Sequence, residues 1–249
     1  MNRIQKAIAI LGLTTALGGL AATANATPSK ERFSSREQSF YLYQQDIAAA
    51  VMGRSNSITQ TPDDLFQQGL DKSDRGNYSS AIEDFTQVLR IDPNFIEAYC
   101  NRGLAKAMLG NMEAAIEDFN QALRVNPNHA DAHNKLGNAR ASLGKHQAAL
   151  ENFNQALRLD PNFVDAYYNR GLTRYSLGDR QGAIADYTQA LKLNPNMAEA
   201  HGNRGVARQA LGDKQGALAD LQKAAQLFRA QGNMANYQQT QELLRNLQQ

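Results

Sequence analysis

The sequence predicts an all-α fold in which helix-turn-helix units stack into a solenoid. Three observations indicate this fold: two series of glycines and one series of prolines, each of which recurs with a period of 34 residues. A fixed period of this length is typical of proteins built from one repeated supersecondary unit. The marks are Gly69, Gly103, Gly137, Gly171 and Gly205; Gly76, Gly110, Gly144, Gly178 and Gly212; and Pro93, Pro127, Pro161 and Pro195.

The second glycine of each pair and the proline mark the ends of helices. Gly110 follows the apolar Leu109, where a residue in the left-handed conformation ends a helix and lets the chain reverse. Pro161 follows an apolar helical run that ends at Leu159, and proline prevents a helix from continuing. One unit therefore contains two helices and two turns.

The first glycine of each pair lies inside a helical pattern, where glycine costs about 1 kcal/mol relative to alanine. Its recurrence requires a common reason. Alanines recur on the second helix with the same period, as at Ala115 and Ala122. We expect small residues to face small residues so that the two helices approach closely, with bulky residues such as Ile116 and Phe119 filling either side.

The spaced residues carry a family resemblance. The pattern is complete in one unit as Tyr99, Gly103, Gly110, Ala115, Phe119, Ala122 and Pro127. The chain resembles tetratricopeptide repeat proteins of the exported bacterial type. This resemblance implies a right-handed α-solenoid of five units, at residues 62–95, 96–129, 130–163, 164–197 and 198–231. Arg229 replaces the proline in the last unit, so we expect its second helix to run on.

The segment before the repeats has two predicted parts. Arg3 and Lys6 precede an apolar run, and Ala24-Asn25-Ala26 follows it, so residues 1–26 are predicted to be a signal peptide, with an uncleaved anchor as the alternative. The predicted location is then the periplasm, or the thylakoid lumen if the source is cyanobacterial.

Residues 27–61 are predicted to be flexible, with an amphipathic helix over 36–52. This helix is expected to pack on the first unit or act as a tether; binding a partner or oligomerising is the alternative. After the repeats, residues 232–249 are predicted to form a capping helix, because the last apolar face of a solenoid needs a cover.

Charge and cysteine content exclude some classes. The net charge is +2, and Arg3 and Lys6 account for it, so the rest of the chain lacks the basic excess of a non-specific nucleic-acid binder. Cys100 is the single cysteine, which rules out a disulfide framework within the chain. Its place in the helical pattern predicts a partly buried thiol.

No catalytic or metal-binding motif is recognisable. Phosphate-binding loops, the HExxH zinc motif and CxxC are absent. His129 and His133 are four residues apart, but two histidines are insufficient for a zinc site. The carboxylates repeat with the unit and form no singular acid–base pair. We therefore predict no enzymatic activity, no cofactor and no bound metal.

Candidate binding residues lie on the first helix of each unit. At 100° per residue, unit positions 2, 5, 6, 9, 12 and 13 share one face, which lines a peptide-binding groove in the family that the chain resembles. Carboxamides suit this role because each offers a donor and an acceptor, although acidic residues in a first helical turn are also explained by the helix dipole. The candidates are Glu97, Asn101, Asp131, Asn134, Asn138, Asp165, Tyr168, Asn169, Tyr175, Glu199 and Asn203.

Two charged series predict ion pairs or surface charges. Arginine at position 7 occurs with an aspartate 16 residues later, as at Arg170 and Asp186, whereas the third unit has Leu136 and Asn152. The first unit, with Gln68 and Asp84, breaks this correlation. We predict that arginine and aspartate pair between the two helices of one unit. The basic residues at position 11 are expected to keep their charges in water; they are Lys72, Lys106, Arg140, Arg174 and Arg208.

These observations predict a non-catalytic protein–protein interaction scaffold or adaptor. Its groove would bind a peptide segment of an unknown partner protein, in envelope or thylakoid protein assembly. The alternative is a self-associating structural protein of the cell envelope. We expect no nucleic-acid partner and no stable membrane insertion once the signal is cleaved, and the oligomeric state is left open.

Overall fold

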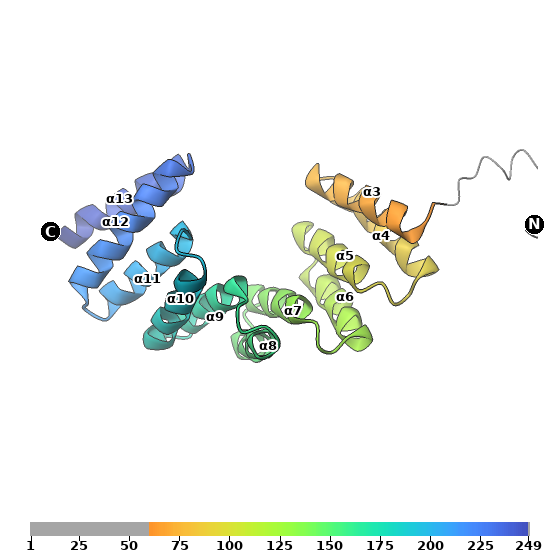
Figure 1. The fold of residues 1–249 in the computed structure, drawn as a ribbon, viewed down its shortest axis with the longest axis horizontal. Helices are drawn as coiled ribbons and strands as arrows, with labels where there is room; N and C mark the ends of the chain where they lie inside the picture. The colour runs from red at the N-terminus through yellow and green to blue at the C-terminus, as the bar shows by residue number, and fades with distance from the viewer. Residues whose placement is uncertain (1–59, 249) are drawn as a thin grey trace, which may run out of the picture. The chain divides into compact units, whose positions relative to one another are not determined.

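The computed structural model describes residues 60–248, and every regular element in this part of the chain is an α-helix (Figure 1). The predicted signal peptide and the predicted helix over 36–52 lie outside the described residues. The all-α, helix-turn-helix fold class is confirmed. The helices are α3 (Pro62–Asp74), α4 (Tyr78–Ile91), α5 (Ile96–Met108), α6 (Met112–Val125), α7 (Ala130–Ser142), α8 (His146–Leu159), α9 (Val164–Ser176), α10 (Arg180–Leu193), α11 (Ala198–Ala210), α12 (Lys214–Ala230) and α13 (Met234–Gln248).

The turns within the helix pairs have the predicted glycine conformation. The φ angle is +82° at Gly110 and is positive at the other four glycines of that series, and also at Gly232. In the turn after α5, the amide of Asn111 donates to the carbonyl of Lys106 at 3.0 Å. This closes the helix end and reverses the chain, so a second helix can pack back on the first.

The first glycine of each pair makes room for an aromatic ring. A Cβ atom on Gly103 would lie 2.6 Å from Cε1 of Phe119, and one on Gly171 would lie 2.7 Å from Cε1 of Tyr187. The expectation that small residues face small residues is therefore wrong at these glycines, because the ring occupies the space that a Cβ would take. The alanines nevertheless lie at the helix contact, and Ala115 is fully buried.

Neighbouring pairs pack through apolar clusters. The cluster between α8 and α9 contains Ala156, Leu157 and Ala166, with Phe163 and Tyr167 packed against it. Each second helix thus contacts the first helix of the next pair as well as its own partner. This nearest-neighbour packing is what gives a solenoid its core.

The last pair differs from the others at its end. Helix α12 has 17 residues where α10 has 14, which confirms that the helix runs on where proline is missing. Helix α13 packs against α12, and its Leu244 and Leu247 join a cluster with Leu221 and Ala225. The apolar face of the last pair is covered in this way.

The predicted arginine–aspartate pairs are confirmed. Arg170 on α9 donates from Nε and Nη2 to the two carboxylate oxygens of Asp186 on α10, at 2.9 and 2.6 Å. Its third nitrogen reaches the preceding pair, where Nη1 donates to Oδ1 of Asn154 on α8 at 2.8 Å. The arginine therefore links two successive pairs. The same bidentate geometry joins Arg102 to Asp118 and Arg204 to Asp220.

The position 11 cations do not keep their charges in water, so that expectation is wrong. Nη1 of Arg174 lies 2.8 Å from Oδ2 of Asp186, because this carboxylate is only 2% exposed and a buried charge is costly unless it is fully paired. In the first unit, which lacks the position 7 arginine, the position 11 lysine also pairs with the buried aspartate. Nζ of Lys72 lies 2.6 Å from Oδ2 of Asp84, an oxygen with no other partner among residues 60–248.

Candidate functional site

The first helices form the inner layer of the solenoid. Contacts join α3 to α5, α5 to α7, α7 to α9 and α9 to α11, whereas among residues 60–248 no two second helices touch to the same extent. The layer whose helices lie closer together is the inner side of a curved stack. The face predicted to line a groove therefore belongs to this layer (Figure 1).

The acidic residues at position 2 form a negative edge along this layer. Glu97, Asp165 and Glu199 are exposed, and each lies in the first turn of its helix. Asp131 is half-buried and pairs with Lys135 one turn later. Within residues 60–248 the three exposed carboxylates have no ion pair, so their charge is available to a cationic ligand.

The amide candidates are tied together across successive pairs. Nδ2 of Asn169 donates to Oδ1 of Asn134 at 3.1 Å, and Nδ2 of Asn203 donates to the hydroxyl oxygen of Tyr168 at 3.0 Å. Asn134 is only 6% exposed, which leaves it little surface for a partner. Asn101 instead donates to the main-chain carbonyl of Glu97 in its own helix.

Burial and charge shift the titration of Tyr168. Burial raises the pKa of its phenol, and the Glu199 carboxylate raises that pKa further, while the bond from Asn203 lowers it. The phenol therefore stays neutral near pH 7 and acts as a hydrogen-bonding group. Its ring centroid lies 6.0 Å from that of Tyr187, and this aromatic contact holds the Tyr168 ring in place.

The other two candidates line the middle of the layer. Asn138 is exposed and, with Asn169, lines a hollow of about 310 Å³ between α7 and α9 whose other polar walls include Ser142, Ser176 and His146. The guanidinium of Arg180 lies 5.8 Å from the ring centroid of Tyr175, which is within the range of a cation–π interaction.

Sequence reasoning missed an aliphatic row on the same face. Position 9 was placed on this face, but its residues were not singled out; Leu104 and Leu172 are 39% and 37% exposed there. Met108, at position 13, is 63% exposed. Position 9 is aliphatic in four units, as Leu70, Leu104, Leu172 and Val206, with Asn138 in the third unit, and this repetition was a signal that could have found the row.

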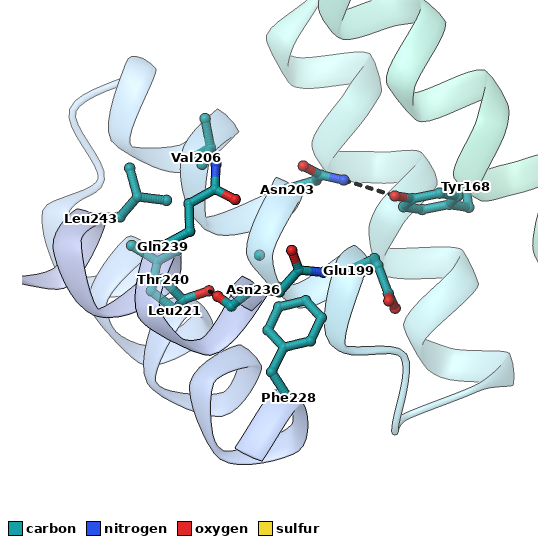
Figure 2. A pocket seen from close by; sticks show the side chains of 11 residues that line it. Tyr168, Glu199, Asn203, Val206, Leu221, Phe228, Asn236, Gln239, Thr240 and Leu243 are labelled. Atoms are coloured by element: carbon teal, nitrogen blue, oxygen red, sulfur yellow. Dashed lines mark hydrogen bonds between the residues drawn. The ribbon is translucent and has the colours of Figure 1, made fainter. Parts of the chain in front are cut away.

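A second omission concerns the end of the layer, where α13 closes a pocket of about 200 Å³. Figure 2 shows its side chains converging from α9, α11, α12 and α13. Tyr168, Glu199 and Asn203 were candidates, but no contribution from the last helix was foreseen, because it lies outside the repeat. The newly found lining residues are Gly202, Val206, Leu221, Phe228, Asn236, Gln239, Thr240 and Leu243.

The histidines and the cysteine have structural contacts. His129 accepts a hydrogen bond from the amide of Ala132 and so caps α7. Nε2 of His133 lies 2.9 Å from the carbonyl of Pro127, and burial lowers the pKa of this imidazole. Cys100 is only 3% exposed, so it is more deeply buried than the predicted partly buried thiol, and burial raises the pKa of its thiol to about 12. Residues 60–248 contain no cluster of three potential metal ligands.

None of the described helices combines the length and the apolar character that crossing a membrane requires.

Stacked helix pairs with an inner face formed by the first helices define the class of α-solenoid repeat proteins. A family model described as "TPR repeat" matches residues 69–110 and 137–178, and models described as "Tetratricopeptide repeat" match 96–129, 164–197 and 119–151. The chain belongs to the tetratricopeptide repeat family. Comparison with curated proteins gave no match.

Several solved structures are similar to the chain. A structure of MamA is 27% identical, with 66% of this chain and 96% of that chain covered and a TM-score of 0.59. TTC0263, a thermophilic TPR protein of Thermus thermophilus, is 22% identical, with coverages of 72% and 98% and a TM-score of 0.62. YrrB, described as a TPR protein with an unusual peptide-binding site, is 19% identical, with coverages of 77% and 97% and a TM-score of 0.57. The last two likenesses show the fold alone.

Proposed function

We propose that this protein is a non-catalytic interaction scaffold whose inner layer of first helices binds a peptide segment of another protein. Family membership supports an interaction role, and YrrB, which shares this fold, is described as having a peptide-binding site. The observation that carries the proposal is the row of exposed aliphatic side chains at Leu104, Met108 and Leu172. It lies on the same face as carboxylates and amides that have the chemistry to orient a peptide.

The physical reasoning follows from burial. Covering an exposed leucine removes apolar surface from water, which stabilises a complex by about 25 cal/mol per Å², although association and side-chain ordering offset much of this gain. Amides such as that of Asn203 and carboxylates such as that of Glu199 then bind polar groups of the peptide and so fix its orientation in the groove. In this proposal residues 1–26 direct export. The exported chain then binds its partner in the periplasm or the thylakoid lumen during envelope or thylakoid protein assembly.

The test is in-cell crosslinking of the full chain with a C-terminal affinity tag, comparing the parent with a groove variant, Leu104→Gln with Leu172→Gln. A matched control carries Ile91→Gln with Leu193→Gln, which changes two exposed aliphatic residues on second helices. We expect a protein crosslinked to the parent and to the control to be lost from the groove variant. Equal capture by all three would contradict the groove as the site, and capture of only this chain would favour the self-associating structural role.

A further inference from the structure

The pocket beneath α13 differs from the rest of the inner layer, because a helix outside the repeat closes it. Its floor is apolar and buried: Leu221 has no exposed surface and Phe228 is 5% exposed. Val206 from α11 and Leu243 from α13 complete the apolar walls (Figure 2). A buried apolar floor below an exposed rim is the arrangement that accepts a single side chain of a ligand.

The volume limits the size of that side chain. The pocket holds about 200 Å³, and an engineered apolar cavity of about 150 Å³ is large enough to bind benzene. One phenyl ring or one branched aliphatic side chain therefore fits, whereas alanine would leave most of the pocket empty. The pocket is therefore the right size for a leucine, methionine or phenylalanine side chain.

The rim supplies polar groups that have no partner within residues 60–248. Neither the carboxamide of Asn236 nor that of Gln239 takes part in a hydrogen bond there, whereas the amide of Asn203 is already bound to Tyr168. Two free amides beside an apolar floor are placed to bind the carbonyl and the amide of one peptide unit.

The charge on the rim is negative and uncompensated. Glu199 is exposed, it has no ion pair among the described residues, and no lysine or arginine lines the pocket. The field of its carboxylate reaches the pocket wall, since it contributes to the raised pKa of Tyr168. The other hollow of the inner layer, between α7 and α9, has no carboxylate in its lining. A cationic group on the ligand can therefore form an ion pair with Glu199 at this end of the inner layer.

We propose that the α11–α13 pocket anchors the partner segment, by taking one large apolar side chain between Val206, Phe228 and Leu243 while an adjacent lysine or arginine pairs with Glu199. The inference rests on the proposed function, since it names the chemistry of the segment that the inner layer binds. Asn236 and Gln239 hold the main chain between the two side chains.

The test is to pan a random dodecapeptide library against the purified chain and its variants. We expect the parent to enrich peptides with leucine, methionine or phenylalanine next to lysine or arginine. Val206→Phe fills the pocket and should weaken binding of a synthetic consensus peptide by about ten-fold or more, which is the scale for losing the burial of one such side chain. Glu199→Gln should weaken it by about three-fold, as expected for an exposed ion pair, and should remove the preference for a basic neighbour.

Two matched controls separate these effects from changes in folding. Leu193→Phe introduces the same ring at an exposed aliphatic position of the second helix α10, and Glu113→Gln removes an exposed glutamate from the first turn of the second helix α6. Both should leave the consensus affinity and the basic preference unchanged, and circular dichroism should report the same helix content for all variants.

The outcomes distinguish the two proposals. Enriched peptides that bind the parent and Val206→Phe equally, or that carry no basic residue, would overturn the anchor pocket while leaving the inner layer as a peptide site. No enrichment by the parent would count against the proposed function and against the pocket together.

Discussion

Removing the carboxylate of Asp186 is the sharpest perturbation of the ion-pair system. Asp186 is 2% exposed and accepts three short hydrogen bonds, from Nε and Nη2 of Arg170 and from Nη1 of Arg174. The change Asp186→Ala leaves both guanidinium groups without their shared partner. Breaking a buried pair by removing one member costs about 3–5 kcal/mol. The two arginine side chains are 15% and 28% exposed and so keep part of their hydration, which places the expected cost near 3 kcal/mol.

The opposite truncation should cost less. In Arg170→Leu the carboxylate of Asp186 is still paired with Arg174, at 2.8 Å, so no uncompensated charge remains. The loss is that of hydrogen bonds to a charged group, about 1.5–3 kcal/mol, partly offset by the leucine. The double change Arg170→Leu with Asp186→Asn reproduces the third unit, where Leu136 accompanies Asn152 and Arg140 donates to that amide at 2.7 Å. We expect it to be more stable than Asp186→Ala.

The assay is urea unfolding followed by circular dichroism at 222 nm, with thermal melts alongside. Urea is uncharged and does not screen the ion pairs as guanidinium chloride would. A cost near 3 kcal/mol corresponds to a loss of roughly 6–12 °C in melting temperature for a chain of this size. Asp165→Ala is the control, because this carboxylate is exposed and its contribution at a helix start is about 0.3–1 kcal/mol. Equal costs for Arg170→Leu and Asp186→Ala would refute the idea that Arg174 compensates.

Two further predictions concern the core. Gly103→Ala should lower stability by about 1–3 kcal/mol, because the added Cβ would lie 2.6 Å from the Phe119 ring. Gly202→Ala, whose Cβ would meet nothing nearer than 3.8 Å, should be neutral or stabilising by about 1 kcal/mol; thermal melts compare the two, and equal losses would contradict the packing argument. Cys100 should react slowly with Ellman's reagent in the native protein at pH 8, because its pKa of about 12 leaves almost no thiolate below that value, and rapidly once urea unfolds the chain. Fast native labelling would contradict the buried position.

Local rules explain how much of the fold could be predicted. A glycine after an apolar run requires the left-handed conformation whatever surrounds it, so the turn at Gly110 followed from the chain alone. The 100° rotation per residue likewise placed Asn169 and Asn203 on one face without any knowledge of the packing. The segment assignments before residue 60 and the binding role of the groove residues stay predictions.

Contacts between side chains were harder to predict because they depend on how helices cross. The sequence indicated that Arg170 and Asp186 pair, since arginine and aspartate occur together in the second, fourth and fifth units and are both absent from the third. It did not indicate that Arg174 shares the same carboxylate, because a long flexible side chain has many rotamers and its choice follows from the burial of Asp186. The pocket beneath α13 was missed for a related reason: Asn236 and Gln239 lie outside the 34-residue period, so no repetition marks them.

The sequence by itself determined the period, the helix ends and the face that each residue takes, since these depend on backbone conformation and on helical geometry within one segment. Only the tertiary structure decided that the Phe119 ring rests on Gly103, and that Asn203 binds Tyr168 35 residues away. The physical reason is that these contacts require two helices to lie at a particular distance and rotation. That arrangement is selected by the packing of all the side chains between them, and no single segment encodes it.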